Sequence, residues 1–283
     1  MKLITWNIQW CRGCDGVVDP VRIVRDAQAM GDFDVLCLQE VARNFPGLAG
    51  SRGEDQFQLL AELLPGFTPI EGIATDKRAE DGTRRQFGNY VLSRYPVLQV
   101  FKHLLPWPAD ATVPSMQRAA LEAVIDAPGG PLRVTTTHLE YYSLKQRSAQ
   151  VDALRALQAE AAAHAADPDV HEKKGGPFER LPRPASGILT ADFNLRPHSA
   201  AYQQICASIQ GGPRYTDSWQ VRHPGVSHAP TLGLFDKRQW PDQSFACDFI
   251  FVTEDLAPRV RDVQVNSQTQ ASDHQPVMLT LDD

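Results

Sequence analysis

Long apolar runs are missing from this sequence of 283 residues. No stretch approaches the roughly 18 consecutive apolar residues of a membrane-spanning helix, and the first residues lack the basic stretch and apolar block of a secretory signal. We therefore expect a cytoplasmic protein without stable membrane insertion. Internal repeats and heptad arrays are missing too, which excludes a solenoid and a coiled coil.

Positively charged residues are also fewer than negatively charged ones, at 28 Lys and Arg against 34 Asp and Glu. The net charge is −6 and the isoelectric point is near 5.8. A protein that grips nucleic acid over a wide surface is usually basic, so the composition argues against strong nonspecific binding. A metal site uses several carboxylates, however, and the negative balance therefore leaves a phosphodiester substrate open.

The five cysteines do not indicate a disulfide framework. They are an odd number and they are scattered along the chain. Cys11 and Cys14 have the CxxC spacing of a redox or zinc site, but no second CxxC or paired histidine motif completes a tetrahedral set. We interpret these two residues as loop cysteines.

Short segments rich in Val, Ile, Leu, Phe and Thr, bounded by turn residues, predict ten strands. These are residues 2–6, 34–39, 87–93, 97–104, 118–125, 132–137, 186–191, 247–253, 260–265 and 276–281.

Helix signals are fewer. Asp19-Pro20 predicts a helix over 20–30, and the capping box of Ser143 and Gln146 starts a helix to about 165. Leu144 and Val151 lie on the apolar stripe of that second helix. Further helices are expected over 54–64 and 199–207, and residues 168–186 read as a long loop.

This element pattern predicts an α+β fold. Helices lie between strands near the start of the chain, whereas later strands follow one another in pairs, which is typical of a two-sheet sandwich with helices on its outer faces. No break in composition marks a second domain, so we expect a single domain over 1–283.

Polar side chains stand at the ends of five predicted strands. A single polar residue at a strand end usually caps a turn. Polar residues at the ends of five strands, however, predict a binding or catalytic site. Oxygen ligands beside imidazoles suit Mg²⁺ or Mn²⁺ better than zinc, and they are the groups that metal-assisted phosphoryl transfer needs. The residues are Asn7, Glu40, His138, Asp192 with Asn194, and Asp273 with His274.

Six motifs occur through the chain in a fixed order. They are Thr5-Trp6-Asn7-Ile8, Leu38-Gln39-Glu40-Val41, Gly88-Asn89-Tyr90-Val91-Leu92-Ser93-Arg94, Thr137-His138-Leu139, Thr190-Ala191-Asp192-Phe193-Asn194 and Ser272-Asp273-His274-Gln275-Pro276. In order and spacing, over residues 3–281, they resemble the motif series of the endonuclease/exonuclease/phosphatase superfamily, which has the DNase-I-like fold. The resemblance implies a four-layer α/β/β/α sandwich with two mainly antiparallel sheets.

The resemblance also implies a role for each matching residue. Glu40 would be the principal metal ligand, with Asn7 and Asp273 beside it. Asp192 would orient or deprotonate the attacking water. The other implied roles are phosphate contacts by Asn7, Asn89, Arg118, Asn194 and Thr231, and catalysis by Asn194, His138, Asp248 and His274.

Two positions depart from the family pattern. Gln9 stands where some members have an aspartate, so we expect one ion rather than two. Ala246 and Phe249 stand where an arginine and a tyrosine are frequent, but the pairing of Asp248 with His274 should survive. Such carboxylate partners should raise the pKa of both site histidines toward neutrality or above, so activity should fall at high pH.

The sequence leaves several substrate classes open. Lys77, Arg78, Arg84 and Arg85 are expected on a loop near the site, where they would contact a phosphate backbone or form a plain solvated loop. Trp107 and Trp240 would stack bases, touch lipid or pack down. We expect a monomeric endonuclease or exonuclease acting on DNA or RNA. The alternatives are a phosphodiesterase or phosphatase acting on a phospholipid, an inositol phosphate or another small phosphoester, and a noncatalytic binding module.

Overall fold

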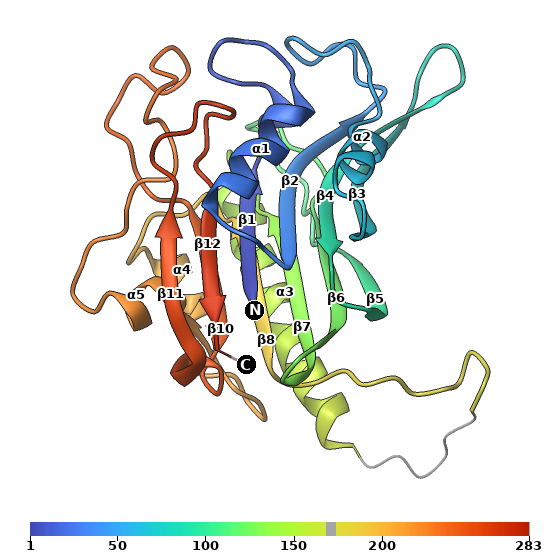
Figure 1. Cartoon of the computed structure of the whole chain (residues 1–283), viewed down its shortest axis with the longest axis vertical. Coiled ribbons are helices and arrows are strands. Elements are labelled where there is room, and N and C mark those ends of the chain that lie inside the picture. Colours follow the sequence, from blue (N-terminus) through green and yellow to red (C-terminus); the bar gives the residue numbers. More distant parts are fainter. Residues whose placement is uncertain (168–173, 283) are drawn as a thin grey trace.

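The computed structural model describes residues 1–167 and 174–282 and shows two six-stranded sheets packed face to face (Figure 1). The strands of the first sheet are β1 (Lys2–Asn7), β2 (Val35–Arg43), β3 (Thr68–Arg78), β4 (Arg84–Ser93), β11 (Val260–Val265) and β12 (Val277–Leu281). Their order is β11-β12-β1-β2-β4-β3, and only the β1–β2 pair is parallel among these described strands.

The second sheet has the same design. Its strands are β5 (Val97–Leu104), β6 (Ala119–Ala127), β7 (Gly130–His138), β8 (Gly187–Asp192), β9 (Tyr215–Asp217) and β10 (Asp248–Thr253). Their order is β5-β6-β7-β8-β10-β9, with β7 and β8 parallel and the other neighbouring pairs antiparallel.

Four described helices cover the outer faces of the sheets: α1 (Pro20–Met30), α2 (Gln56–Leu63), α3 (Leu144–Ala166) and α4 (Ala200–Ile205). Helix α5 (Ser218–Arg222) contacts β9, β10 and β11, and there are 3-10 turns η1 (Gln9–Cys11) and η2 (Ala257–Arg259). The Asp19 side chain caps α1 and the Ser143 side chain caps α3, as the sequence predicts. Side chains of α1 and α2 pack on the first sheet, and those of α3 and α4 pack on the second.

Alternation along the strands produces three cores. Leu3 and Val35 lie in the core between the sheets, whereas their neighbours Ile4 and Leu36 lie under α1 and α2. Successive side chains of a strand point to opposite faces, so alternate residues of a strand buried on both sides pack into two different cores. The predicted four-layer α/β/β/α sandwich is confirmed.

The ten predicted strands are all present, but β3, β9 and α5 were not predicted. The ends of β3 are exposed, so its apolar pattern is weak, and β9 has only three residues. Leu144 was wrongly placed on the buried stripe of α3, because its side chain is 72% exposed. Of the expected loop over 168–186, residues 168–173 lie outside the described residues, and the remainder contains no helix or strand.

The expected loop of basic residues is a β-hairpin instead. Lys77 and Arg78 end β3, and they pair with Arg85 and Arg84 at the start of β4. Asp76 accepts a hydrogen bond from Arg84 at 2.7 Å, which neutralises part of the charge. Backbone pairing therefore fixes the positions of these residues along the hairpin.

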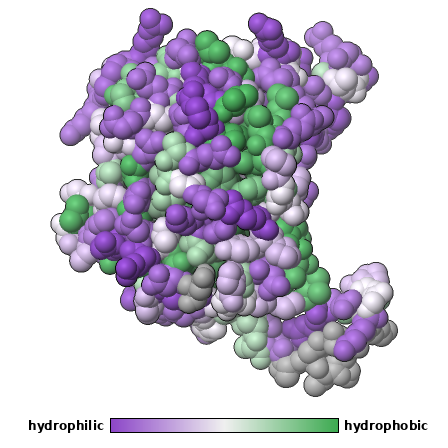
Figure 2. All heavy atoms as spheres, in the orientation of Figure 1, coloured by the Kyte–Doolittle hydropathy of each residue, from purple (hydrophilic) through white to green (hydrophobic). Residues whose placement is uncertain are grey.

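The surface is of mixed polarity. Figure 2 shows a mainly hydrophilic face with apolar residues gathered toward its upper right part. Within the described residues no helix has both the length and the apolar character needed to cross a bilayer.

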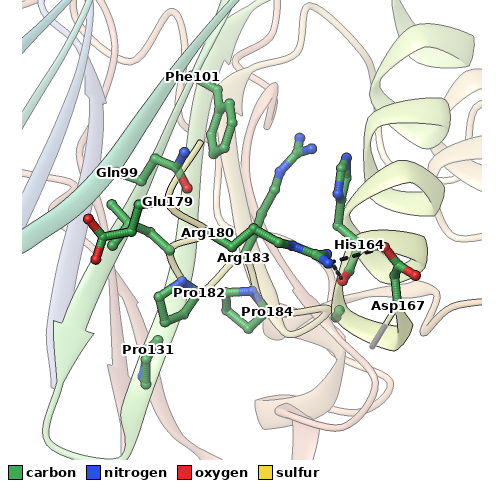
Figure 3. A pocket seen from close by; sticks show the side chains of 12 residues that line it. Gln99, Phe101, Pro131, His164, Asp167, Glu179, Arg180, Pro182, Arg183 and Pro184 are labelled. Atoms are coloured by element: carbon green, nitrogen blue, oxygen red, sulfur yellow. Dashed lines mark hydrogen bonds and ion pairs between the residues drawn. The ribbon is translucent and has the colours of Figure 1, made fainter. Parts of the chain in front are cut away.

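A cavity of about 550 Å³ lies against β5, β7 and the segment before β8 (Figure 3). Arg183 lies here over the ring of Phe101, at 4.3 Å. Pro131 lines the cavity at the start of β7, whereas His138 ends that strand, and seven residues of strand span about 23 Å. The cavity is therefore far from the strand ends that carry the candidate site.

Near this cavity an ionic cluster surrounds Glu122, whose side chain is 1% exposed. Arg183 Nε donates to it at 2.9 Å, and Arg133 Nη1 and His103 Nε2 lie 3.5 and 3.6 Å away. Burial alone would raise the pKa of Glu122, but the contacts with His103, Arg183 and Arg133 outweigh burial and lower it to about 2. The ionised carboxylate therefore stabilises the folded state.

We predict that acid destabilises the protein through Glu122. The pKa of this group is 4.5 when unperturbed and about 2 in the folded chain, so its contribution is complete above about pH 4.5 and is lost as the pH falls toward 2. That shift corresponds to about 3 kcal/mol. Urea unfolding between neutral and acid pH should show a shallower pH dependence for Glu122→Gln than for wild type.

Glu254→Gln is the matched control, because the Glu254–Arg214 pair is exposed. An unchanged pH dependence in Glu122→Gln would contradict the assignment.

Candidate active site

Three of the expected site residues are brought together by strand alternation. Asn7, His138 and Asp192 end β1, β7 and β8, each on the face directed at the opposite sheet. Four residues earlier on the same three strands, the side chains lie in the core between the sheets, and residues separated by an even number share a face. Those earlier residues are Leu3, Val134 and Ile188.

Glu40 reaches the site by a different route. Leu36 and Leu38 point toward the helices, so an undistorted strand would direct Glu40 there as well. The pairing of β2 with β4 shifts register between Leu38 and Val41, and Glu40 has a φ of 60°, in the left-handed region. A bulge of this kind redirects a side chain. Glu40 therefore lies beside residues of the inner faces.

Asn7 links the two carboxylates of the site. Its Nδ2 donates to Glu40 Oε1 and to Asp192 Oδ2, at 3.0 Å each. The backbone of Gln9 donates to Asn7 Oδ1 at 3.0 Å, which fixes the orientation of the amide. Asn7 thus holds apart two acidic groups from opposite sheets.

His138 and Asn194 lie next to Asp192. His138 Nε2 is 3.2 Å from Asp192 Oδ2 and 3.1 Å from Asn194 Nδ2, and its Nδ1 is 3.8 Å from Glu40 Oε1. Asn194 also donates to the carbonyl of Leu139 and, through its backbone, to Asp192 Oδ1 at 3.0 Å. The φ of Asn194 is 51°, a conformation that asparagine tolerates better than most residues.

His274 pairs with Asp248 as the resemblance implies. His274 Nδ1 lies 2.9 Å from Asp248 Oδ2, and its Nε2 lies 3.6 Å from Asp192 Oδ2. The same Asp248 oxygen accepts from the Thr231 hydroxyl at 2.6 Å. Thr231 therefore lies behind Asp248 and supports it, and its hydroxyl is not directed at the position expected for a phosphate.

Asp273 is held by a residue whose role the sequence left open. Trp240 Nε1 donates to Asp273 Oδ2 at 3.0 Å, and Ser272 Oγ lies 3.3 Å from Asp273 Oδ1. The negative charge of Asp273 acts on Glu40. The loop that carries Trp240 is thus tied to the acidic part of the site.

Arg118 and Asn89 line a small cavity together with Glu40 and His138. The cavity has a volume of about 10 Å³, which is room for about one water molecule or ion. Arg118 Nε donates to Glu140 Oε2 at 3.4 Å, and Asn89 donates to the carbonyl of Ala119. Their first contacts are therefore with the protein, at the wall of the site.

The acidic residues fit a divalent cation. Burial, followed by the charge of Asp273, raises the pKa of Glu40 to about 7, and burial raises that of Asp192 to about 6. A cation placed among these groups would favour their ionised forms. Oxygen donors are also the ligands that Mg²⁺ and Mn²⁺ prefer.

A second group with metal-binding chemistry lies beside them. Ligand atoms of Asp192, Cys247, Asp248 and His274 all lie within 4.8 Å of one another. Burial raises the pKa of the Cys247 thiol well above its usual value, so sulfur is a poor ligand here. Asp248 and His274 already bond each other, which is the geometry of an orienting carboxylate and a charged imidazole.

The pKa values of His274 and His138 are shifted in opposite directions. Burial alone would lower the pKa of His274, but the charges of Asp248 and Asp192 raise it well above 6.5. Burial, with the charges of Arg118 and His274, holds the pKa of His138 well below 6.5. The expectation that both histidines have a raised pKa is therefore wrong for His138, because burial of the ring, together with the charges of Arg118 and His274, outweighs the carboxylates of Asp192 and Glu40 beside it.

We predict that NMR of isotope-labelled imidazoles will show this difference directly. At pH 6.5, His274 should show the shifts of an imidazolium and His138 those of a neutral ring, because the pKa of His274 lies well above this value and that of His138 well below it. His274→Gln and His138→Gln assign the signals. A titration midpoint near pH 6.5 for either ring would contradict the prediction.

The comparisons with known proteins agree with this geometry. Residues 4–274 match the Endonuclease/Exonuclease/phosphatase family, and the chain belongs to that family. Its members are hydrolases of phosphoester bonds. A search of curated proteins found no match.

Solved structures share the fold. An endonuclease/exonuclease/phosphatase from Beutenbergia cavernae is 25% identical with a TM-score of 0.71, over 99% of this chain and 71% of that one. A 3'-5' exonuclease from Neisseria meningitidis is 20% identical with a TM-score of 0.63, over 100% of both chains. A mannosyl-6-phosphatase from Bacteroides thetaiotaomicron is 16% identical with a TM-score of 0.67, also over 100% of both.

Proposed function

We propose that this chain is an Mg²⁺- or Mn²⁺-dependent phosphodiesterase whose substrate is DNA or RNA, cleaved as an endonuclease or an exonuclease. One observation carries the proposal. Carboxylates and amides from both sheets converge with a neutral and a charged histidine in one connected group of contacts around Asp192. No site residue implied by the family resemblance is missing, which argues against a noncatalytic binding module.

Glu40, Asp273 and Asn7 would hold one ion. When bound, the ion neutralises negative charge that develops on the phosphate in the transition state. The side chain of Gln9, where some relatives have an acidic residue, is directed at Gln239, with 3.0 Å between Nε2 and Oε1. That contact supports a single ion rather than two.

Asp192 would position and deprotonate the attacking water. A pKa near 6 suits a group that accepts a proton close to neutral pH. His274, held charged by Asp248, would stabilise the nonbridging oxygens, and Asn194 and the neutral His138 would complete their contacts. Arg118 would add positive charge at the wall that it forms with Asn89, while Thr231 would keep Asp248 in place.

The nature of the substrate is supported by a structural neighbour. One structural neighbour is a 3' phosphatase from Neisseria bound to a product DNA hairpin, with 19% identity and a TM-score of 0.64. The net charge of −6 favours the alternative, a small or lipid phosphoester, because such a substrate needs no basic surface. Hydrolysis of DNA, RNA, phosphoinositides and sphingomyelin, with and without EDTA, separates these possibilities.

We predict that Asp192→Asn and His274→Ala each lower turnover about 100-fold or more, because each removes a proton-transfer or charge-stabilising group. The assay is Mg²⁺-dependent hydrolysis of a generic phosphodiester, with circular dichroism to confirm folding. Asp126→Asn, an exposed position on β6, is the control. Hydrolysis near the wild-type rate in either site variant would refute the assignment.

We further predict that Trp240→Phe weakens the binding of the metal ion. The variant keeps a ring but loses the hydrogen bond to Asp273, and loss of a group that orients a ligand typically costs about 10- to 100-fold in metal affinity or activity. The Mg²⁺ concentration for half-maximal activity should rise accordingly. Trp107→Phe is the matched control, because its indole bonds only Ser115 in the described structure. Equal metal dependence of the two variants would count against Asp273 as a ligand.

A further inference from the structure

A groove of about 740 Å³ leads away from the candidate active site. Asn194, which contacts Asp192 and His138, forms part of its lining. The groove then runs along the first turns of α3 and α4. Asn194 therefore joins this groove to the position of a scissile phosphate held at Asp192.

Aromatic rings line the groove and remain exposed. Tyr141 and Tyr142 are 42% and 58% exposed and meet edge to face, with centroids 4.8 Å apart. Tyr141 also packs edge-on against Trp240, at 5.9 Å, and Trp240 is bonded to Asp273. Phe245 contributes a further ring, which is half-buried. Apolar surface gathered beside a site in this way indicates a binding surface.

Two arginines lie among these rings. Arg147 Nη1 donates to the backbone carbonyls of Glu140 and Tyr141, at 2.9 and 2.8 Å. Arg196 lies 4.0 Å from the ring centre of Phe245. In the described part of the chain, neither guanidinium has a carboxylate in hydrogen-bonding contact, so both charges are available to an anion.

We propose that this groove binds the nucleotide that neighbours the scissile phosphate in a single-stranded nucleic acid. Its base stacks on the Tyr141–Tyr142 pair, and its phosphate binds Arg147 and Arg196. Rings interleaved with basic groups are the equipment for sequence-tolerant binding of single strands. In a duplex, neighbouring bases cover the base faces, so a paired strand cannot use the rings.

This inference rests on the proposed phosphodiesterase function, but it can be tested without turnover. Fluorescence anisotropy in EDTA measures the Kd of a labelled single-stranded DNA oligonucleotide. Tyr142→Ala should raise the Kd about 5- to 150-fold, the range that follows from about 1–3 kcal/mol per stacked base, and Arg196→Ala should raise it through loss of a phosphate contact. Tyr142→Phe, which keeps the ring, and Arg261→Ala, an exposed arginine on β11, are the matched controls.

The salt dependence separates the two contacts. Removing one phosphate contact lowers the slope of log Kd against log salt by about 0.7 for a single strand. Arg196→Ala should show this change, and Tyr142→Ala should keep the wild-type slope because a stacked ring releases no counterion. In Mg²⁺, the ratio of kcat/KM for the oligonucleotide to that for methyl p-nitrophenyl phosphate should fall in both variants.

Three results would overturn the proposal: an unchanged Kd in both variants, equal affinity for a blunt duplex, or binding to phosphatidylserine vesicles without binding to the oligonucleotide. Failure of the proposed function appears differently. In that case the wild-type chain hydrolyses no phosphodiester in Mg²⁺. The Kd measured in EDTA does not depend on turnover, so it still shows whether the groove binds single-stranded DNA.

Discussion

Hydrogen bonds between the two sheets fix the site. Asn7 on β1 bonds Asp192 on β8, and Gln39 on β2 donates to Thr136 on β7 at 2.8 Å. The apolar core between the sheets is close-packed, but apolar contacts carry little directionality of their own. These polar contacts stand at the end of that core and set the position of one sheet relative to the other. The chemistry of every other site residue depends on that position.

Electrostatic balance follows from the same arrangement. Asn7 places neutral N–H groups between Glu40 and Asp192, which would otherwise repel each other. The negative charge of Asp248 favours the cationic form of His274, while burial, together with the charge of Arg118, favours the neutral form of His138. Two identical side chains in one site thus acquire different roles from their neighbours. Burial strengthens each of these effects because the local dielectric is low.

The sequence was sufficient to predict much of this architecture. Period-two alternation is strictly local, so residues such as Asn7 and Asp192 could be placed at strand ends from the apolar pattern before them. The direction of Glu40 could not be predicted, because it depends on a bulge between two strands. The bond from Trp240 to Asp273 and the influence of Arg118 on His138 were also beyond prediction. They join residues far apart in the chain, and only tertiary packing brings them together.

The Asp248–His274 pair has a consequence for the whole sandwich. Asp248 begins a strand of the second sheet, whereas the backbone carbonyl of His274 accepts a hydrogen bond from Trp6 of the first, at 2.9 Å. Sliding of one layer over the other by a fraction of an ångström would lengthen this contact. A substitution that changes side-chain volume in the core between the sheets can therefore abolish catalytic activity, even though it alters no site residue. Selection for activity should narrow the range of side chains that this core accepts, even where many apolar residues would preserve the fold.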